Sequence, residues 1–147
     1  MFGLDRYSGP LLSILRIVVG LLFLEHGTAK FLHFPAVEMF AQTPPAFGVL
    51  WFSGVLELFG GALIVLGAFT RPVAFLLSGE MAVAYWMVHA PQSPFPLVSQ
   101  GEGAVLYCFV FLYFAAVGAG PWSVDAVLRK KAQLPLCGCC STQTVRA

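Results

Sequence analysis

Apolar residues fill four long stretches of this 147-residue chain, and shorter polar segments separate them. The stretches cover residues 10–32, 47–69, 72–89 and 102–120. At a rise of about 1.5 Å per residue, helices of these lengths match the roughly 30 Å hydrocarbon core of a bilayer. The pattern therefore predicts an all-α integral membrane protein, built as a four-helix bundle with four spans.

Composition supports a membrane protein and excludes several soluble classes. Hydrophobic residues make up 59% of the chain and charged residues 10%, whereas soluble domains contain about 25% charged residues. The formal net charge of +1 provides no basic surface for nucleic acid. The sequence contains no G-x-G-x-x-G, Walker or nucleophile-elbow motif, so we assign no nucleotide cofactor and no catalytic residue.

Lysine and arginine residues are distributed unevenly between the two sides of the predicted bundle. Lys30 lies on one side, and the other side receives Arg6, Arg71, Arg129, Lys130, Lys131 and Arg146. Because positive residues favour the cytoplasmic side, both termini are expected to be cytoplasmic. Residues 1–132 form one transmembrane domain in this prediction. Residues 133–147 lack apolar periodicity and are predicted to be a disordered tail that contains cysteines.

Helical spacing predicts which face of each span points into the bundle. Small and polar side chains recur every three or four residues, and in lipid such residues let helices approach closely. The first two stripes comprise Ser13, Arg16, Gly20, Phe23, Gly27 and Lys30, and then Ser53, Glu57 and Gly61. The other two comprise Ser78, Ala82, Tyr85 and His89, and then Glu102, Leu106, Phe109, Tyr113 and Ala116.

Counting residues along each span places the ionisable side chains in two polar layers. Each such group costs about 2.5 kcal/mol or more in lipid unless it is paired or hydrated. The inner layer contains Arg16, Glu57 and Glu80. We interpret it as a buried ion pair in which Arg16 meets Glu57 or Glu80 and fixes the register of the helices.

The outer layer contains His26, Lys30, His89 and Glu102, and Tyr85 shares a helix face with His89. Two imidazoles, an ammonium and a carboxylate can bind a polar head group or relay protons. The structural alternative is that Lys30 and Glu102 only extend toward the membrane surface.

Two acidic residues do not fit these stripes. Glu25 and Glu80 each lie about half a turn away from the inward face of their span. One interpretation is that they face another subunit, in a homo-oligomer or in a complex. The other is that the helix is rotated, so that Glu80 pairs with Arg16.

The cysteines provide little chemistry. Cys108 lies within the fourth span and is expected to pack as a small apolar residue. Cys137, Cys139 and Cys140 fall on the predicted cytoplasmic side, where disulfides are disfavoured. These three thiols could hold a soft metal or accept a lipid, but they lack the paired spacing of a zinc site, so we expect no metal and a dispensable tail.

Successive motifs along the chain resemble those of the DoxX family of small bacterial four-helix membrane proteins. They are RIVVGLLFLEHGTAKFL, ELFGGALIVLGAFTR, His89, GEGAVLY and GAGPWSVDAVL. The resemblance implies a multi-pass protein of the bacterial inner membrane. It also implies motif positions at Arg16, Lys30, Glu57, Arg71, His89 and Glu102. The cysteine-rich tail, Glu25 and Glu80 depart from the family pattern.

The resemblance and the polar layers together support three hypotheses. Relatives in the family include a subunit associated with thiosulfate:quinone oxidoreduction and members linked to membrane oxidoreductase complexes. The first hypothesis is therefore a subunit of, or accessory to, a quinone-linked membrane oxidoreductase, with a partner protein supplying the redox centre. Such a subunit is either non-catalytic or in contact with the quinone. The second is a structural or assembly partner in a membrane complex, and the third is a pathway for a small solute or protons.

Overall fold

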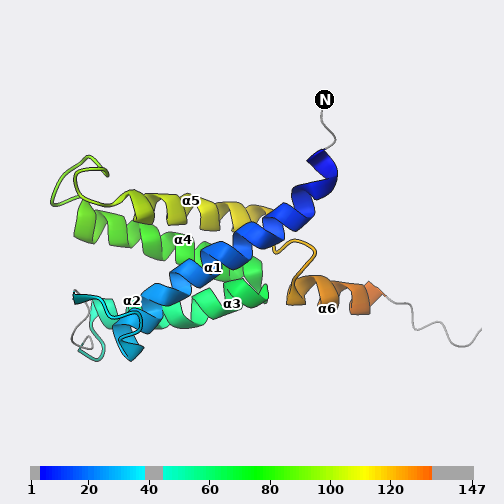
Figure 1. The fold of residues 1–147 in the computed structure, drawn as a ribbon, viewed down its shortest axis with the longest axis horizontal. Coiled ribbons are helices and arrows are strands. Elements are labelled where there is room, and N and C mark those ends of the chain that lie inside the picture. Colours follow the sequence, from blue (N-terminus) through cyan, green and yellow to red (C-terminus); the bar gives the residue numbers. More distant parts are fainter. Residues whose placement is uncertain (1–3, 39–44, 134–147) are drawn as a thin grey trace, which may run out of the picture.

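The computed structural model describes residues 4–38 and 45–133, and the regular structure within these segments is helical (Figure 1). A short 3-10 turn, η1 (Leu4–Tyr7), leads into the long helix α1 (Ser8–Leu32). This helix matches the first apolar stretch, because its sequence contains strong helix formers and no internal proline after its first turn.

The second and third apolar stretches are also helical, and each contains a π-helical turn. The second runs through α2 (Val49–Val55), the π-helical turn η3 (Leu56–Gly60) and α3 (Gly61–Leu66). The third runs through α4 (Thr70–Ala84) and ends in the π-helical turn η4 (Tyr85–His89).

The last two helices are α5 (Glu102–Val117) and α6 (Val124–Gln133). Helices α4 and α5 pack along each other, and α1 crosses α2, η3 and α3 diagonally (Figure 1). Contacts of α4 with α3 and η3 join these two layers. Helix α6 points away from the other helices along the long axis of the molecule (Figure 1).

Apolar side chains from α1, α3, α4 and α5 form the core between the two layers. Its buried members are Val19, Phe23, Ile64, Ala74, Leu77, Met81, Phe111 and Phe114. The surface outside this core is also apolar: Leu11, Phe52, Phe75 and Phe109 are among many large hydrophobic side chains that are exposed. A surface of this kind suits hydrocarbon rather than water.

Helix lengths agree with a membrane-associated protein. Within the described residues, the helical segments Asp5–Leu32 and Val49–Leu66 are long and apolar enough to cross a membrane, and Glu102–Val117 is apolar but shorter. The prediction of an all-α fold is confirmed for the described residues, and the two long apolar helices are consistent with a helical membrane protein.

The predicted inward stripe of α1 is confirmed, because all of its members are buried. Gly27 allows the closest approach between α1 and η3. A Cβ atom added at Gly27 would lie 2.6 Å from the backbone nitrogen of Leu58, which no real side chain tolerates. Apolar contact between helices brings no hydrophobic gain in lipid, so this backbone contact contributes through dispersion and packing.

The predicted inward face of α5 is wrong. Leu106, Phe109 and Tyr113 are exposed, whereas Phe111 and Phe114 on the opposite face are buried. Helix α5 carries one charged residue, Glu102, so its sequence is too uniformly apolar for periodicity to select a face. The Ser78 hydroxyl, which was predicted to point inward, fixes the packing by donating a 2.8 Å hydrogen bond to the carbonyl of Cys108.

Arg16 organises one end of the molecule, which we call the Arg16 end and which contains Gly67 and Ser123. Its side chain is completely buried, with 0% exposure. The guanidinium donates to the carbonyl of Ala119 at 2.9 Å, of Val65 at 2.6 Å and of Trp122 at 2.6 Å, and it also donates to the carbonyl of Ile64. The positive charge therefore binds the carbonyls at the end of α3 and in the α5–α6 connection.

Gly67 makes room for this arrangement. It ends α3 with a φ of 68°, a left-handed conformation that glycine adopts without strain. A Cβ atom at this position would also lie 3.0 Å from Cζ of Arg16. The predicted pairing of Arg16 with Glu57 or Glu80 is therefore not formed, because the carbonyls at the Arg16 end already occupy the guanidinium.

Replacement of Arg16 by alanine is expected to reduce the free energy of unfolding by about 3 kcal/mol or more, because each buried carbonyl left unpaired costs about 1 to 3 kcal/mol. The measurement is the membrane abundance of the variant and its thermal midpoint in detergent. Arg71→Ala is the matched control, since Arg71 is exposed and makes one 3.5 Å contact with the carbonyl of Val117. Equal behaviour of the two variants would contradict this role for Arg16.

Asp125 attaches α6 to the Arg16 end. Its Oδ1 accepts a 2.8 Å hydrogen bond from the Phe69 amide, and its Oδ2 accepts a 2.9 Å bond from the Thr70 amide at the start of α4. The Asp125 amide in turn donates to the carbonyl of Gly67 at 3.0 Å. Partial burial acts to raise the pKa of Asp125, but the hydrogen bonds from Thr70 and Phe69 and the charge of Arg129 outweigh it and lower the pKa below the ordinary value of 3.8.

The attachment of α6 is expected to weaken in acid. Because the pKa is lower in the folded state, the contribution of Asp125 is present above pH 3.8 and is lost as the pH falls through the folded value. Hydrogen exchange at the Phe69 and Thr70 amides, corrected for intrinsic rates, measures this loss. Asp125→Asn should expose one of the two amides already at neutral pH, because asparagine keeps only one acceptor oxygen, whereas Asp5→Asn should not change either amide. Unchanged protection in Asp125→Asn would show that the carboxylate does not hold α4.

Candidate functional site

A buried ion pair connects α1 to η3. The ammonium of Lys30 lies 2.7 Å from each carboxylate oxygen of Glu57, and it donates a 2.8 Å hydrogen bond to the Ser53 hydroxyl. Ser53 donates to Oε1 of Glu57 at 3.2 Å. Exposure of the Lys30 and Glu57 side chains is 6% and 5%, so the pair is almost completely shielded from the surroundings.

The helix geometry explains why Lys30 reaches Glu57. Side chains on a helix lean toward its N-terminus, so the ammonium of Lys30 lies deeper in the molecule than its backbone. Gly54 leaves room for the aliphatic part of the Lys30 side chain, since an added Cβ there would lie 3.3 Å from Cδ of Lys30. Counting residues along the spans ignores the length of the side chain, and it therefore assigned Lys30 and Glu57 to different layers.

Both π-helical turns carry predicted site residues. Glu57 lies in η3, and Tyr85 and His89 lie in η4. A π-helical turn is rare, and single turns of this kind occur frequently at functional sites. We call the part of the molecule opposite the Arg16 end the His89 end. It contains η4 and the α4–α5 loop.

Glu80 of α4 faces the Lys30–Glu57 pair. Both of its carboxylate oxygens are buried, and neither has a hydrogen-bond partner among the described residues. The groups that act on its charge are Glu57, Ser53 and Lys30. Ser53 lies close to Glu80 but donates its proton to Glu57, so Glu80 stands beside the pair without joining it. We call Lys30, Ser53, Glu57 and Glu80 the carboxylate cluster.

Tyr85 and His89 hold the loop at the His89 end. Nδ1 of His89 lies 2.9 Å from the carbonyl of Ser99, and the Tyr85 hydroxyl donates to the carbonyl of Pro94 at 3.3 Å. The two rings stack with their centroids 6.4 Å apart. A carbonyl only accepts hydrogen bonds, so Nδ1 of His89 carries a proton and Nε2 is the acceptor of the neutral ring.

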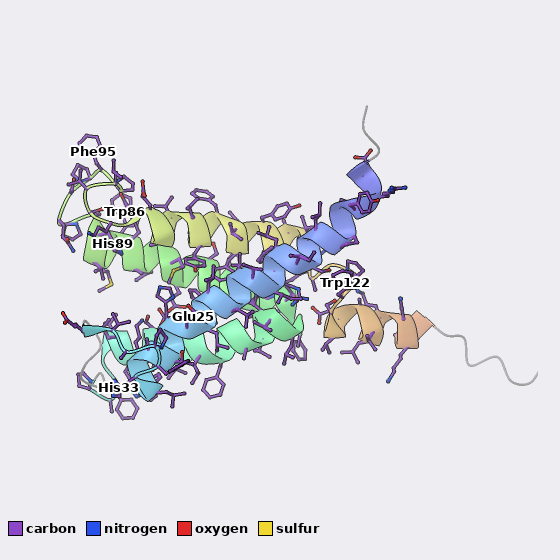
Figure 2. All side chains as sticks on the ribbon, in the orientation of Figure 1. Glu25, His33, Trp86, His89, Phe95 and Trp122 are labelled. Atoms are coloured by element: carbon purple, nitrogen blue, oxygen red, sulfur yellow. The ribbon has the colours of Figure 1, made fainter. Side chains whose placement is uncertain are left out.

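The remaining predicted residues lie outside the carboxylate cluster. His26 is exposed, hydrogen-bonds through Nδ1 to the carbonyl of Leu22, and meets the ring of Tyr107 edge to face at 6.1 Å. Glu102 is exposed at the first turn of α5, and Glu25 is exposed on α1. Figure 2 shows Glu25 on α1 apart from His89 at the end of the neighbouring layer.

The structure therefore divides the predicted outer layer instead of forming one cluster. It brings Lys30 together with Glu57 and Glu80, and it places Tyr85 with His89 on the loop. Over the described ranges, no three His, Cys, Asp or Glu side chains form a group that could hold a metal. Cys137, Cys139 and Cys140 lie outside the described residues.

Comparison with protein families assigns the chain to a known group of proteins. A family model for DoxX matches residues 11–90. The chain belongs to the DoxX family. This assignment confirms the resemblance found in the sequence motifs and agrees with a membrane-associated, helical protein.

A relative in Haemophilus influenzae is similar along most of the chain. This uncharacterized protein is 42% identical over 134 residues, which cover 89% of the present chain and 100% of the relative. No solved structure matches the chain. The DoxX match contains the whole carboxylate cluster and His89, whereas Glu102 and α5 follow it.

One residue of the carboxylate cluster was not identified as a site residue from the sequence. Ser53 was placed on the inward face, and its spacing of four residues from Glu57 is the signal that would have indicated a hydrogen bond along the helix. The contact of Tyr107 with His26 depends on how α5 packs, which the sequence does not show.

Lys30→Met is expected to reduce the free energy of unfolding by about 3 to 5 kcal/mol, because it leaves the Glu57 carboxylate buried without its counter-charge. Glu57→Gln should cost less, since Glu80 can take over as the acidic partner of Lys30. The double variant Lys30→Met/Glu57→Met removes both charges and should recover much of the loss. Thermal midpoints in detergent measure the series, with Lys130→Met on the exposed surface of α6 as the control. An additive double variant would contradict the coupling.

Proposed function

We propose that this DoxX-family protein is a subunit of, or accessory to, a quinone-linked membrane oxidoreductase. In this proposal the chain crosses the bacterial inner membrane four times with both termini in the cytoplasm. Residues 1–132 form the membrane domain. The observation that carries the proposal is the carboxylate cluster, in which a buried lysine meets two glutamates that have buried carboxylate oxygens. The three residues lie on three different helical segments, one of which is the π-helical turn η3.

Such a cluster requires an explanation beyond helix packing. A charged group at membrane depth costs about 2.5 kcal/mol or more, and ionisable residues in these positions mark proton and ligand sites. The Arg16 end already fixes the register of α1, α3 and α5 through carbonyl groups. The second charged centre is therefore available for chemistry.

The groove between α4 and α5 fits a quinone. It is shallow and apolar, has a volume of about 190 Å³, and its lining residues include Met81, Tyr85 and Phe109. An apolar ring or an isoprenoid unit fits such a groove. When bound, a quinone accepts two electrons and two protons. The acceptor nitrogen of His89, the carboxylate of Glu102 and the hydroxyl of Tyr85 supply polar contacts at the same end.

A partner protein supplies the redox centre in this proposal. The sequence contains no nucleotide motif, and electron transfer needs a cofactor to carry it. The DoxX chain then positions the ring of the quinone and handles its protons, with His26, Lys30, His89 and Glu102 as the residues that contact the head group or move protons.

A structural or assembly role is the second candidate. It is favoured by Arg16, whose hydrogen bonds serve packing, and by the hydrogen bond that ties His89 to the loop. In this alternative, the charged residues specify how helices meet and how the chain docks on a partner, with no reaction at the His89 end.

Purification of the intact complex from native membranes in mild detergent separates the two candidates. The proposal expects a copurified oxidoreductase and a bound quinone, identified by mass spectrometry and by extraction. His89→Ala and Glu102→Gln should keep normal abundance while lowering the quinone-linked activity of the complex by about a hundredfold or more. Gln92→Ala, an exposed change in the same loop, is the control. Copurified partners without a redox centre, or full activity in both variants, would favour the assembly role.

A further inference from the structure

The carboxylate cluster has an unequal number of charges. Lys30 contributes one positive charge, and ionised Glu57 and Glu80 would contribute two negative charges. A net charge in an apolar environment is unfavourable unless something compensates it. The cluster therefore requires one more positive charge when both acids are ionised.

The hydrogen bonds point to where that charge belongs. Lys30 and Ser53 satisfy Oε1 of Glu57. Oε2 of Glu57 lies 2.7 Å from the Lys30 ammonium, so the ion pair covers it, whereas neither oxygen of Glu80 has a hydrogen-bond partner among the described residues. Glu80 is thus the carboxyl group that lacks compensation, and the charge of Glu57 acts on it. A proton on Glu80 would supply a hydrogen-bond donor for the carboxylate of Glu57.

Within the part of the chain that the structure describes, the neighbours of Glu80 on the adjacent helices add no further positive charge beyond Lys30. Lys30 of α1 and Glu57 of η3 are the charged groups that act on Glu80, and Ser53 of α2 is the polar group beside them. Helix α5 packs on the other side of α4, and its only charged residue, Glu102, is exposed at its first turn. The Cys108 carbonyl of α5 is occupied by Ser78. The titratable Tyr107 of α5 faces Phe23 and His26.

The geometry points to a buried site that binds one proton between the carboxyl groups of Glu80 and Glu57. Lys30 and Ser53 hold Glu57 in a fixed orientation, and Glu80 carries the proton as a carboxylic acid at neutral pH. The two acids titrate as a coupled pair, so the proton belongs to the site rather than to one residue. This inference goes beyond the proposed function, because it requires neither a quinone nor a redox partner.

A site of this kind makes the carboxylate cluster a reversible proton store. Release of the proton leaves two carboxylates beside one ammonium, and uptake restores a neutral cluster. No covalent bond other than the O–H bond of Glu80 forms or breaks. The unpaired oxygens of Glu80 are the atoms that exchange the proton with an acceptor such as water or a ligand hydroxyl.

Infrared spectroscopy of the purified full-length protein in lipid nanodiscs tests the inference. The carbonyl stretch of a protonated carboxylic acid should be present at neutral pH, should shift in deuterated water, and should disappear in Glu80→Gln. Glu57→Gln should remove the same band although Glu80 remains, because the cluster then has one ammonium and one acid, and Glu80 ionises. The matched control is Glu25→Gln on the exposed surface of α1, which should leave the band unchanged.

Stability provides an independent readout. Glu80→Gln should fold with normal abundance and should lose the pH dependence that the wild-type thermal midpoint shows when the site releases its proton. Absence of the acid band in the folded wild-type protein would overturn the inference, as would a band that persists in Glu80→Gln. A band that appears only when sodium and potassium are removed would instead assign the missing charge to a metal cation. The failure of quinone binding, by contrast, would not affect any of these results.

Discussion

The constraint on which this fold depends is the need to satisfy a buried guanidinium and the carbonyls at helix ends with each other. Water is scarce beside apolar helices, so each unpaired polar group costs more there than at an aqueous surface. Arg16 meets this constraint by donating to carbonyls from α3 and from the α5–α6 connection, and Gly67 gives it the space. Asp125 completes the same end by accepting the first amides of α4. Four segments of the chain thus meet around one positive charge and one negative charge.

The two charged centres of the molecule differ in how completely they are satisfied. Arg16 uses backbone groups that the helices must pair in any case, so its burial serves the architecture. The carboxylate cluster is held by Lys30, yet it leaves Glu80 and one oxygen of Glu57 without hydrogen bonds. The groups that can still accept a proton or a hydrogen bond from a ligand therefore belong to the second centre. This contrast, rather than the presence of charge alone, separates the structural centre from the candidate site.

Close contact between α1 and the second helical segment positions that site. Gly27 brings α1 close to the backbone of η3, and Gly54 makes room for the side chains of Phe31 and Lys30. Lys30 extends along this contact to Glu57. The π-helical turn η3 coincides with the position of Glu57, and η4 coincides with Tyr85 and His89. The π-helical turns therefore coincide with polar side chains of the predicted site, whereas the regular helices provide most of the apolar contacts. DoxX membership is consistent with this arrangement, because the family match covers both turns.

The sequence by itself determined the helical stretches and the buried face of α1, because hydrophobicity and small residues follow a strong periodic pattern there. It also indicated the residue types of the site. Only the tertiary structure decided which charges meet. Lys30 reaches Glu57 because its side chain leans back along the helix, and Arg16 binds carbonyls, which a sequence pattern does not display. The face of α5 was equally undetermined, since an almost uniformly apolar helix is oriented by packing at Phe111 and Phe114 and by the bond from Ser78. Partner choice among buried polar groups depends on distances of a few ångströms, and those distances are set only when the helices are assembled.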